Sequence, residues 1–323
     1  MRILFITANR LGDAILSTGL LDELHRQRPK ARFTVVCGPA AAGVFTAAPN
    51  LERIIVMRKK PWARHWWDLW KQVAATRWSL VLDLRGSGIG QFLMAHRRRG
   101  YSGSAPHMHK VIALSNVLKL NAPAHPVVWT TAEHAATAAR LWPEDGTPTL
   151  ALGPTANWGG KIWPGDRFAE LATRLTAPGG ILPNARIVVF GGPGEEALAT
   201  ATLAGLPADR TLDLIGKVEL PVLAAALRRC AFYIGNDSGL MHLAAASGTP
   251  TLGLFGPSRE RVYGPWGEKT ASVRTDLSYD EIVQQPGYDY RRQDSHMLSL
   301  SVDKAQAAAE HLWRYAQDDD SDD

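Results

Sequence analysis

The 323-residue sequence has little cysteine and no long uninterrupted hydrophobic run. Its two cysteines, Cys37 and Cys230, each fall in or beside a segment that is expected to form a strand, and no spacing typical of metal ligands is present. Two free thiols, buried in a reducing compartment, are therefore expected in preference to a disulfide. No apolar run approaches the roughly 18 residues of a membrane span, so a transmembrane helix is not expected either.

The first residues, MRILFITANRLGD, also lack the features of a secretion signal. Their apolar stretch stops at Asn9 and Arg10, which makes it too short for the hydrophobic part of a signal peptide. A first buried strand is the better interpretation. These absences together predict a cytoplasmic protein.

Positive charge is in excess, although the chain ends in the acidic run DDDSDD. The formal net charge is +5, and much of the excess lies in the first half, within residues 58–64 and 97–99. A basic surface of this kind attracts nucleic acid, phospholipid headgroups or a phosphorylated substrate. The acidic end, residues 318–323, is expected to be a disordered tail.

Apolar runs and helical patterns alternate along the whole chain. Strands separated by helices of this length predict βαβ units, and therefore an α/β fold with a parallel sheet in each half. The expected strands are Ile3–Thr7, Arg32–Val36, Arg53–Val56, Leu80–Asp83, Leu150–Leu152, Ala185–Phe190, Leu212–Asp213, Phe232–Gly235 and Thr251–Phe255. The expected helices include Ala14–Arg28, Ala132–Leu141, Arg167–Thr176, Glu195–Ala204, Leu220–Arg228 and Val302–Gln317.

The length of the chain fits two domains of roughly 150 residues each. Proline and glycine are concentrated in LWPEDGTPTLALGPTANWGG, residues 141–160, which places the boundary near residues 143–148. We therefore expect a first domain at residues 1–145 and a second at 146–301, followed by the helix at 302–317 and the acidic tail.

Open α/β sheets bind ligands beyond the carboxyl ends of their strands, where helix N-termini point. The first loop at such a position is TANRLGDAILSTG, in which Gly12 permits close backbone approach and Asp13 stands at the start of the helix. A carboxylate in a ligand cleft is a candidate general base. Aspartate is also a favoured helix N-cap, so Asp13 has a purely structural interpretation as well.

The second loop, GPTANWGGKIWPGDRF, carries Gly159 and Gly160 directly before Lys161. Backbone N–H groups that glycines expose beside one lysine suit a phosphate, although the spacing is not that of a P-loop. The alternative is an ordinary connection with a solvated lysine.

The third loop, VVFGGPGEEALA, places Glu195 and Glu196 at the start of a helix. Acidic residues at this position usually complement the helix dipole, but one of the two is also placed to reach a ribose hydroxyl. The glycine spacing is too weak for a dinucleotide fingerprint.

The fourth loop lies within YIGNDSGLMHLAAASGTPTLGLFGPS. Asp237, Ser238 and Gly239 form a small helix N-terminus whose backbone N–H groups can face an anion, and His242 stands near the first turn, where it can donate to a phosphate oxygen. Alternatively, Asp237 is an N-cap and His242 is a core residue. Two of these loops acting together would bind a diphosphate.

These four motifs resemble glycosyltransferase family 9, the ADP-heptose:lipopolysaccharide heptosyltransferase family. NDSGLMHLAAASGTPTLGLFGPS is similar to the family signature D-[ST]-G-x-x-H-x-A-x-A…P…-[LYF]-G-P-[ST], and RLGDAILSTGLL is similar to its N-terminal loop. GGKIWP matches its K-x-W-P element and FGGPGE its strand–turn–Glu element. The matches occur in the family order and cover most of the chain except roughly residues 58–129.

The resemblance implies a GT-B architecture, in which two Rossmann-like parallel-sheet domains face a central cleft. It further implies an inverting, metal-independent glycosyltransferase that needs no cofactor. The acceptor would bind the first domain, and the nucleotide sugar, expected to be ADP-heptose, would bind the second.

Residue roles follow from the same motif positions. Asp13 would be the general base for the acceptor hydroxyl. Backbone N–H groups at Ser238 and Gly239, together with His242 and Lys161, would stabilise the leaving diphosphate. Glu195 matches the place that contacts the nucleoside, with its neighbour Glu196 as the alternative. The expected donor-binding set is Lys161, Asp237, Ser238, Gly239, His242, Glu195 and Asn157.

The acceptor side is least like the family. RKKPWARHWWDLWKQVAATRW, residues 58–78, holds five of the eleven tryptophans, with Trp62, Trp66 and Trp70 at helical spacing and Trp67 widening the face. We expect at least half of these rings to pack on their own domain. The alternative is a membrane-facing edge, since tryptophan beside lysine and arginine suits an anionic lipid interface.

In the family the acceptor is a lipid A-linked core sugar, which is anionic and agrees with the basic charge. The segment HRRRGYSG, residues 96–103, is expected to belong to the same surface or to recognise an acceptor phosphate. The expected partners are a nucleotide sugar, an anionic glycolipid or oligosaccharide acceptor, and the cytoplasmic face of the inner membrane by peripheral contact. The expected acceptor-side residues are Gly12, Arg10, Lys60, Arg64 and Arg97.

Three other interpretations stay open. A family 9 enzyme with another nucleotide sugar or acceptor would share the fold and the mechanism. A sugar-nucleotide epimerase on the same fold would need additional acid/base residues and no acceptor surface. A nucleic-acid-binding protein would use tryptophans among basic residues for base stacking, but four cleft loops in family order argue against nucleic acid as a partner.

Overall fold

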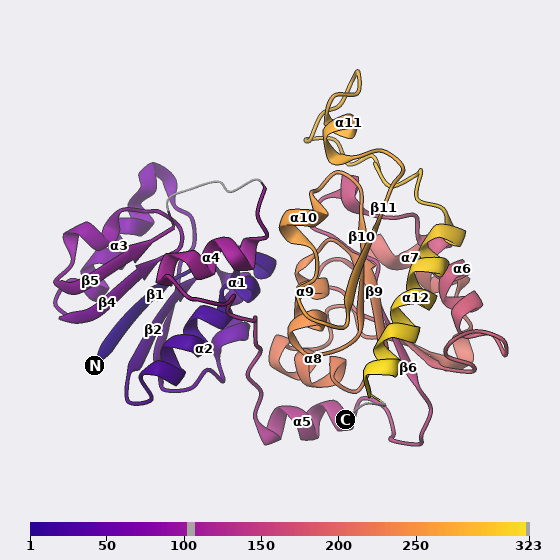
Figure 1. Cartoon of the computed structure of the whole chain (residues 1–323), viewed down its shortest axis with the longest axis horizontal. Coiled ribbons are helices and arrows are strands. Elements are labelled where there is room, and N and C mark those ends of the chain that lie inside the picture. The colour runs from indigo at the N-terminus through magenta and orange to yellow at the C-terminus, as the bar shows by residue number, and fades with distance from the viewer. Residues whose placement is uncertain (102–106, 321–323) are drawn as a thin grey trace. The chain divides into compact units, whose positions relative to one another are not determined.

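The computed structural model describes residues 1–101 and 107–320, which form two compact units (Figure 1). The first unit is Met1–Thr131 and the second is Ala132–Asp323. Each unit is built on one sheet, and all of the paired strands run parallel. The predicted α/β class, with a parallel sheet in each half, is confirmed.

The first unit has a five-stranded sheet in the order β3-β2-β1-β4-β5. Its strands are β1 (Arg2–Ile6), β2 (Arg32–Cys37), β3 (Leu51–Val56), β4 (Trp78–Asp83) and β5 (Ala95–Gly100). Its helices are α1 (Leu11–Leu16), α2 (Thr18–Gln27), α3 (Arg64–Val73) and α4 (Lys110–Leu118), with the 3-10 helices η1 (Pro39–Phe45), η2 (Pro61–Ala63) and η3 (Ile89–Phe92). The chain order reverses between β1 and β4, and at such a switch point a crevice opens beyond the carboxyl ends of the strands.

The central strands form where apolar runs can be buried on both faces of the sheet. β1 is buried from Ile3 to Ile6, and β2 from Phe33 to Cys37. On one face, α3 and η3 cover the strands with a cluster that includes Leu69. Large apolar side chains buried in this way contribute about 1.5–3 kcal/mol each, so this packing positions the loops at the sheet edge.

The helix expected at Ala14–Arg28 is divided into α1 and α2 at Ser17. The Ser17 hydroxyl donates to the Ala14 carbonyl at 2.7 Å and lies 2.7 Å from the hydroxyl of Thr7. A side-chain bond to the helix backbone competes with the regular helical pattern. The expected helix is therefore interrupted by one hydroxyl.

Strand β5 is not predicted, because AHRRRG lacks apolar alternation. It forms through main-chain pairing with β4 from Ala95 to Gly100, and Arg98 donates to the carbonyls of Gly90 at 2.7 Å and Leu93 at 2.6 Å. Charged side chains on an edge strand also discourage pairing with another chain. The basic segment at 96–103 thus begins as an edge strand, and its residues 102 and 103 lie outside the described residues.

The second unit has a six-stranded sheet in the order β11-β10-β9-β6-β7-β8, which reverses between β6 and β9. Its strands are β6 (Thr149–Gly153), β7 (Arg186–Val189), β8 (Thr211–Asp213), β9 (Phe232–Asn236), β10 (Thr251–Phe255) and β11 (Thr270–Arg274). Its helices are α5 (Ala132–Ala139), α6 (Gly165–Leu175), α7 (Thr200–Gly205), α8 (Leu220–Leu227), α9 (Gly239–Ala246), α10 (Glu260–Tyr263), α11 (Tyr279–Val283) and α12 (Val302–Asp320), with the 3-10 helices η4 (Gly159–Lys161), η5 (Glu196–Ala199) and η6 (Ala208–Arg210). Helices α8 and α9 lie on one side of this sheet and α6, α7 and α12 on the other (Figure 1).

Among the elements of this unit that differ from the prediction are one strand and one helix. The edge strand β11 is not predicted, because its half-exposed sequence TASVR contains a single buried valine. The helix expected at Glu195–Ala204 begins as the 3-10 helix η5 and becomes α-helical only from Thr200. Both differences arise where little apolar surface is available to hold a regular element.

The units divide between Thr131 and Ala132, earlier than the boundary expected near residues 143–148. Arg229 explains the difference: its guanidinium donates to the carbonyl of Ala138 at 2.5 Å and to that of Trp142 at 2.8 Å. It also stacks over the Trp142 ring at 4.5 Å. Helix α5 and the segment after it are therefore attached to the second unit, and the proline-rich stretch is not the linker.

The final helix, α12, packs on the second unit beside α6 and β11. Its Ala305 and Leu312 are buried in the core of that unit. The helix continues past the expected end at Gln317, so residues 318–320 are helical instead of forming a disordered tail. Residues 321–323 lie outside the described part of the chain.

Candidate functional site

In the second unit the loops after β6 and β9 meet at the switch point. The two strands are paired in register up to Gly153 and Gly235. Asn236 is completely buried and joins the two loops. Its Nδ2 donates to the Pro154 carbonyl at 2.8 Å, and its Oδ1 accepts from the backbone N–H of Trp163 at 3.1 Å. Parallel pairing and one buried amide therefore hold the two loops side by side.

Lys161 and Asp237 form an ion pair across this junction. Lys161 Nζ lies 2.5 Å from Asp237 Oδ2, although the two residues are 76 positions apart in the chain. Asp237 is buried and Lys161 is partly exposed. A buried carboxylate requires a charged or hydrogen-bonding partner, and Lys161 supplies it. Lys161 is thus not the solvated lysine of the structural alternative.

The N-terminus of α9 opens at the same place. Ser238 is its N-cap, and the Ser238 side chain makes no capping hydrogen bond. The first N–H groups of a helix, here from Gly239 onwards, have no intrahelical acceptor and suit an anion. His242 lies in the first turn and is buried. Asp237 is not the N-cap of α9, and its carboxylate pairs with Lys161 instead of capping the helix.

In the glycine loop before Lys161, the Gly159 N–H is already used within the second unit. The Gly159 N–H donates to Gln293 Oε1 at 2.8 Å, and the Lys161 N–H donates to the Trp158 carbonyl at 3.1 Å. Asn157 on the same loop is exposed, and its side chain has no hydrogen-bond partner among the described residues. The loop therefore contributes the ammonium of Lys161, whereas α9 contributes backbone donors.

Of the two adjacent glutamates, Glu195 faces the strand ends. Its Oε2 accepts from Thr155 Oγ1 at 2.6 Å and from the Gly192 N–H at 2.8 Å, which joins the loops after β6 and β7. Glu196 is exposed and accepts from the Gly194 N–H at 3.2 Å. The geometry favours Glu195 over Glu196 as the carboxylate of this site.

Tyr233, which the sequence analysis did not single out, lies completely buried in β9. A Cβ added to Gly153 or Gly235 would fall 1.9 Å or 2.3 Å from the Tyr233 hydroxyl oxygen, so the ring requires glycine at both positions. Burial raises the pKa of Tyr233; the nearby Ser238 hydroxyl opposes this shift and the Glu195 carboxylate adds to it. The sequence signal for this residue is the pair of glycines at the ends of two apolar runs.

The hydroxyls of Tyr233 and Ser238 are both buried at this site. They lie near one another, yet neither has a hydrogen-bond partner of regular geometry among the described residues. Buried polar atoms without partners are uncommon in native proteins. The two hydroxyls therefore hold unused hydrogen-bonding capacity beside the N-terminus of α9.

In the first unit the loop after β1 carries Arg10, Gly12 and Asp13. Arg10 is the N-cap of α1, and Asp13 lies in the first turn. The partly buried Asp13 carboxylate makes no hydrogen bond or ion pair with any residue of the described part of the chain. The capping interpretation of Asp13 is therefore wrong, and its carboxylate is available for other chemistry.

Arg85 holds this loop from the neighbouring strand. β1 and β4 are adjacent, with Ile6 opposite Asp83. Arg85 follows β4, donates from Nη1 to Asn9 Oδ1 at 3.2 Å, and stacks over the Trp66 ring at 4.8 Å. The contact spans the switch point of the first sheet. Sequence reasoning missed it because one arginine after an apolar run has no distinctive pattern.

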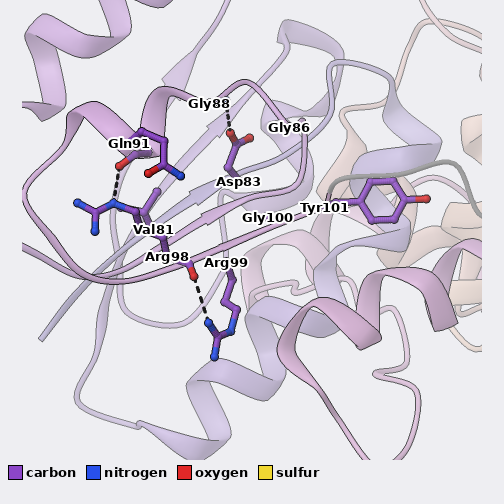
Figure 2. Close-up of a pocket in the computed structure, with 10 residues that line it drawn as sticks. Val81, Asp83, Gly86, Gly88, Gln91, Arg98, Arg99, Gly100 and Tyr101 are labelled. Carbon is purple, nitrogen blue, oxygen red and sulfur yellow. Dashed lines mark hydrogen bonds between the residues drawn. The ribbon is translucent and has the colours of Figure 1, made fainter.

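A cavity of about 430 Å³ lies at the carboxyl ends of β4 and β5 (Figure 2). Asp83 points toward Gly88 in this view and accepts from the N–H groups of Ser87 at 2.8 Å and Gly88 at 3.2 Å. Arg98 also lines the cavity, and its guanidinium donates hydrogen bonds to main-chain carbonyls within residues 90–95. These two charged groups therefore stabilise the cavity wall.

The predicted acceptor-side cations lie on different elements. Lys60 pairs with Asp68 of α3 at 2.8 Å, and Arg64 begins α3. Arg97 lies on β5, at the opposite edge of the sheet from β3. All three cations are exposed, and no contact between described residues joins Arg97 to the other two. The structure does not gather them into one cluster.

The tryptophan-rich segment is divided between core and surface. Trp78 is buried, and Trp66 and Trp70 pack against the same cluster, so the expectation that at least half of the five rings pack on their own domain is confirmed. Trp62 and Trp67 are exposed. Trp62 lies in η2, outside the helix, so the predicted helical spacing holds only from Trp66 onwards.

Cys37 and Cys230 are free and buried, as predicted. Within residues 1–101 and 107–320, no group of three or more histidine, cysteine or carboxylate side chains is arranged to hold a metal ion. In the same part of the chain, no helix combines the length and the apolar character needed to cross a membrane.

Residues 85–287 match the model of glycosyltransferase family 9 (heptosyltransferase). Among curated proteins, lipopolysaccharide heptosyltransferase 1 of Pseudomonas aeruginosa is 24% identical over 307 residues, which cover 86% of this chain and 84% of the relative. The matched range contains the loops after β6, β7 and β9, whereas the loop of Asp13 precedes it.

Solved structures share the fold. The glycosyltransferase family 9 structure from Veillonella parvula has a TM-score of 0.80 at 23% identity, with 97% of each chain covered. The ADP-heptose lipopolysaccharide heptosyltransferase II of Escherichia coli has a TM-score of 0.75 at 19% identity, with 98% of this chain and 100% of that chain covered. Likeness at these identities shows the fold, which is the GT-B architecture.

Proposed function

Since this chain belongs to glycosyltransferase family 9, we propose that it transfers a heptose from ADP-heptose to the core of lipopolysaccharide, with inversion at the anomeric carbon. The Pseudomonas relative is named a lipopolysaccharide heptosyltransferase, and the Escherichia coli structure is that of an ADP-heptose enzyme. Both cover most of this chain, which supports the same donor and acceptor class here.

One junction in the second unit carries the proposal: Lys161 and Asp237 meet at 2.5 Å beside the N-terminus of α9. This junction combines a cation with helix N–H groups, and both stabilise phosphate oxygens. Glu195 adds a carboxylate whose Oε2 is held by Thr155 and Gly192. We assign the diphosphate to Lys161 and the N–H groups at the start of α9, and a ribose hydroxyl to Glu195.

In the proposed reaction Asp13 accepts the proton of the acceptor hydroxyl while that oxygen forms a bond to the anomeric carbon. The bond between the anomeric carbon and the diphosphate oxygen breaks on the opposite face, and the nucleoside diphosphate leaves with the bonding electrons. A single displacement requires only one base. The carboxylate of Asp13 has no partner among the described residues, which supports this role.

Negative charge develops on the diphosphate as it leaves. The N–H groups at Ser238 and Gly239, the dipole of α9, His242 and the ammonium of Lys161 would stabilise that charge. Lys161 would then exchange Asp237 for a phosphate oxygen, and the carboxylate of Asp237 would become available to a hydroxyl of the donor sugar.

We place the acceptor, an anionic glycolipid or its core oligosaccharide, on the first unit. The excess of exposed basic residues around α3 and β5 supports this assignment, because such a surface attracts anions. A lipid-linked acceptor would bring the enzyme to the cytoplasmic face of the inner membrane as a peripheral protein.

A family 9 transferase that uses another nucleotide sugar or acceptor is the second candidate. The tryptophan-rich residues 58–78 favour it, because they lie outside the range that matches the family model. Family membership favours a transferase over the epimerase interpretation.

Calorimetric titration with ADP, UDP and GDP, followed by a transfer assay with ADP-heptose and a heptose-free core acceptor, tests the proposal. We expect ADP to bind about tenfold tighter than the other two, a difference of about 1.4 kcal/mol. We also expect transfer with inversion. Preference for UDP or GDP would show that the donor is a UDP-sugar or a GDP-sugar instead of ADP-heptose. Failure of all three nucleotides to bind would contradict the phosphate site.

A further inference from the structure

Exposed large apolar side chains are concentrated in one segment of the first unit. Among the described residues, five of the eleven exposed large hydrophobic side chains lie within residues 56–94. Trp62 is 94% exposed, Phe92 75%, Trp67 56% and Met94 50%. Scattered apolar side chains on a surface are normal, whereas a local concentration marks an interaction site.

Elements that contact one another carry these side chains, because α3 touches both η2 and η3. We call Trp62, Trp67, Phe92 and Met94 the tryptophan strip. Trp67 stacks on Trp70 with ring centroids 4.8 Å apart, and Trp70 Nε1 donates to the Phe92 carbonyl at 3.0 Å. Between Phe92 and Met94, the side chain of residue 93 is buried in the core cluster, so its two neighbours are directed away from the core. The strip runs from η2 along α3 to the residues after η3.

The turn that presents Trp62 is conformationally unfavourable. Trp62 and Ala63 have backbone φ angles of 54° and 55°, which is the left-handed region. Side chains with a Cβ rarely adopt this region, and the cost is of order 1–3 kcal/mol for each residue. Burial of the indole ring does not offset this cost, because Trp62 is almost fully exposed. Unfavourable turns of this kind occur where they serve a function.

The segments that carry the strip are rich in positive charge. Residues 53–101 contain eleven lysines and arginines but only two aspartates. Asp83 is buried and bonded to its own loop, and Asp68 is paired with Lys60. The ammonium of Lys71 lies 5.5 Å from the centre of the Trp67 ring. The strip therefore presents exposed rings among basic side chains that are largely uncompensated.

We propose that the tryptophan strip docks the enzyme on an anionic lipid bilayer, with the rings at the headgroup level and the basic side chains against lipid phosphates. Tryptophan and phenylalanine beside lysine and arginine are the side chains that suit a membrane interface. The basic side chains select an anionic bilayer over a neutral one. The exposed rings select a bilayer over a polyanion that has no apolar layer.

The strip is placed to serve the reaction. The turn with Trp62 follows β3, and the loop with Asp13 follows β1, so both leave the sheet at its carboxyl edge. The strip extends from the Trp62 turn at this edge along α3 to Met94, which precedes the amino end of β5. Docking through it would bring the α3 face, and with it the Trp62 turn, to the membrane that carries a lipid-linked acceptor. Only that consequence rests on the proposed function, because vesicle binding is measured without donor or acceptor.

Sedimentation of the full-length protein with vesicles tests the proposal. Vesicles of phosphatidylcholine alone are compared with vesicles that also contain phosphatidylglycerol. We expect about tenfold stronger binding to the anionic vesicles, and a decrease as salt is added, because added salt screens exposed charges. Equal binding to both kinds of vesicle, or binding to neither, would overturn the proposal.

Paired variants separate the strip from the rest of the surface. Trp62→Ala with Trp67→Ala is expected to lower vesicle binding about tenfold without changing the melting temperature, because both rings are exposed. Leu198→Ala with Tyr315→Ala removes two exposed side chains of the second unit and is expected to have no effect. Vesicle binding that is the same for both pairs would contradict docking through the strip.

Charge variants test the electrostatic part. Lys59→Glu with Arg64→Glu is expected to weaken binding to anionic vesicles, whereas Lys30→Glu with Arg32→Glu, at exposed positions elsewhere on the first unit, is expected to have a smaller effect. Equal effects of the two pairs would show a general charge attraction and would overturn docking by this surface.

Quenching by brominated lipids gives a readout that does not depend on large substitutions. Brominated lipid in the vesicles is expected to quench the tryptophan fluorescence of the wild-type protein, and Trp62→Phe is expected to reduce the quenched fraction. If Trp62→Phe leaves the quenched fraction unchanged but weakens binding to a single-stranded oligonucleotide, the strip binds nucleic acid and the membrane proposal is wrong.

Discussion

Lys161 Nζ lies 2.5 Å from Asp237 Oδ2, and this contact joins loops that follow two adjacent strands at the switch point of the second sheet. The lysine compensates a buried carboxylate and at the same time is the ammonium that we assign to the donor diphosphate. The two roles compete for one group, so removing Lys161 should affect both stability and binding.

Lys161→Ala is expected to lower the affinity for ADP about tenfold or more, because a charge-assisted hydrogen bond is worth about 1.5–3 kcal/mol. It should also lower the melting temperature, because Asp237 then remains buried without its partner. Calorimetry and thermal denaturation measure the two effects. Lys217→Ala is the control, since Lys217 Nζ lies equally close to Asp213 in an exposed pair, at 2.5 Å. Unchanged ADP affinity in Lys161→Ala would leave Lys161 with a structural role alone.

Asp13→Asn is expected to reduce the rate of transfer about 10²–10⁴-fold, the usual contribution of a general base. Affinity for ADP should stay the same, because Asp13 belongs to the first unit. Asp22→Asn serves as the control, since Asp22 accepts from Arg26 at 3.1 Å in an exposed pair on α2. A loss of stability or of ADP binding in Asp13→Asn would instead indicate that Asp13 supports the fold.

Tyr233→Phe removes a buried hydroxyl and keeps the ring between Gly153 and Gly235. The hydroxyl lacks a regular hydrogen-bond partner, so the free energy of unfolding should be unchanged or about 1 kcal/mol higher. We expect kcat/KM for the donor to fall about fivefold if this hydroxyl orients Ser238 toward the diphosphate.

A double-mutant cycle tests whether the Tyr233 hydroxyl acts through Ser238. Ser238→Ala should lower kcat/KM for the donor by a similar factor, and the two changes should be non-additive, because the hydroxyls would act as one unit. Additive effects would show that Tyr233 does not act through Ser238.

Cys37 and Cys230 are expected to resist alkylation in the folded protein. Burial raises the pKa of each thiol from 9.0 to about 12, so little thiolate is present near neutral pH. Iodoacetamide labelling with mass spectrometry should detect modification only after denaturation. Because the folded-state pKa lies above the unfolded value, the stability from these protonated thiols is complete below pH 9.0 and is lost as the pH rises toward about 12. Rapid labelling of the native protein would contradict this burial.

The sequence predicted the central strands well for a physical reason. Strands inside a parallel sheet are buried on both faces and appear as continuous apolar runs, as in Ile3–Ile6 and Thr251–Phe255. The edge strands β5 and β11 have little buried apolar surface, so main-chain pairing with a neighbour holds them and their side chains leave no pattern.

The sequence predicted which residues belong to the candidate site, but not how these residues are arranged. Motif positions pointed to Lys161 and Asp237, yet the ion pair between them depends on the adjacency of β6 and β9. The bond from Gly159 to Gln293 and the position of Arg85 beside Asn9 also arise from segments far apart in the chain. Local patterns contain no information on such contacts.

Residue order alone was sufficient for the α/β class, for four glycine-rich loops at strand ends, and for the family resemblance, because periodicity and motif chemistry are local properties. Packing decided the order of the strands, and with it the loops that meet at each switch point. It also decided that Tyr233 is buried while Trp62 remains exposed. Both outcomes depend on pairing and burial between distant segments, and these are settled only when the whole chain has folded.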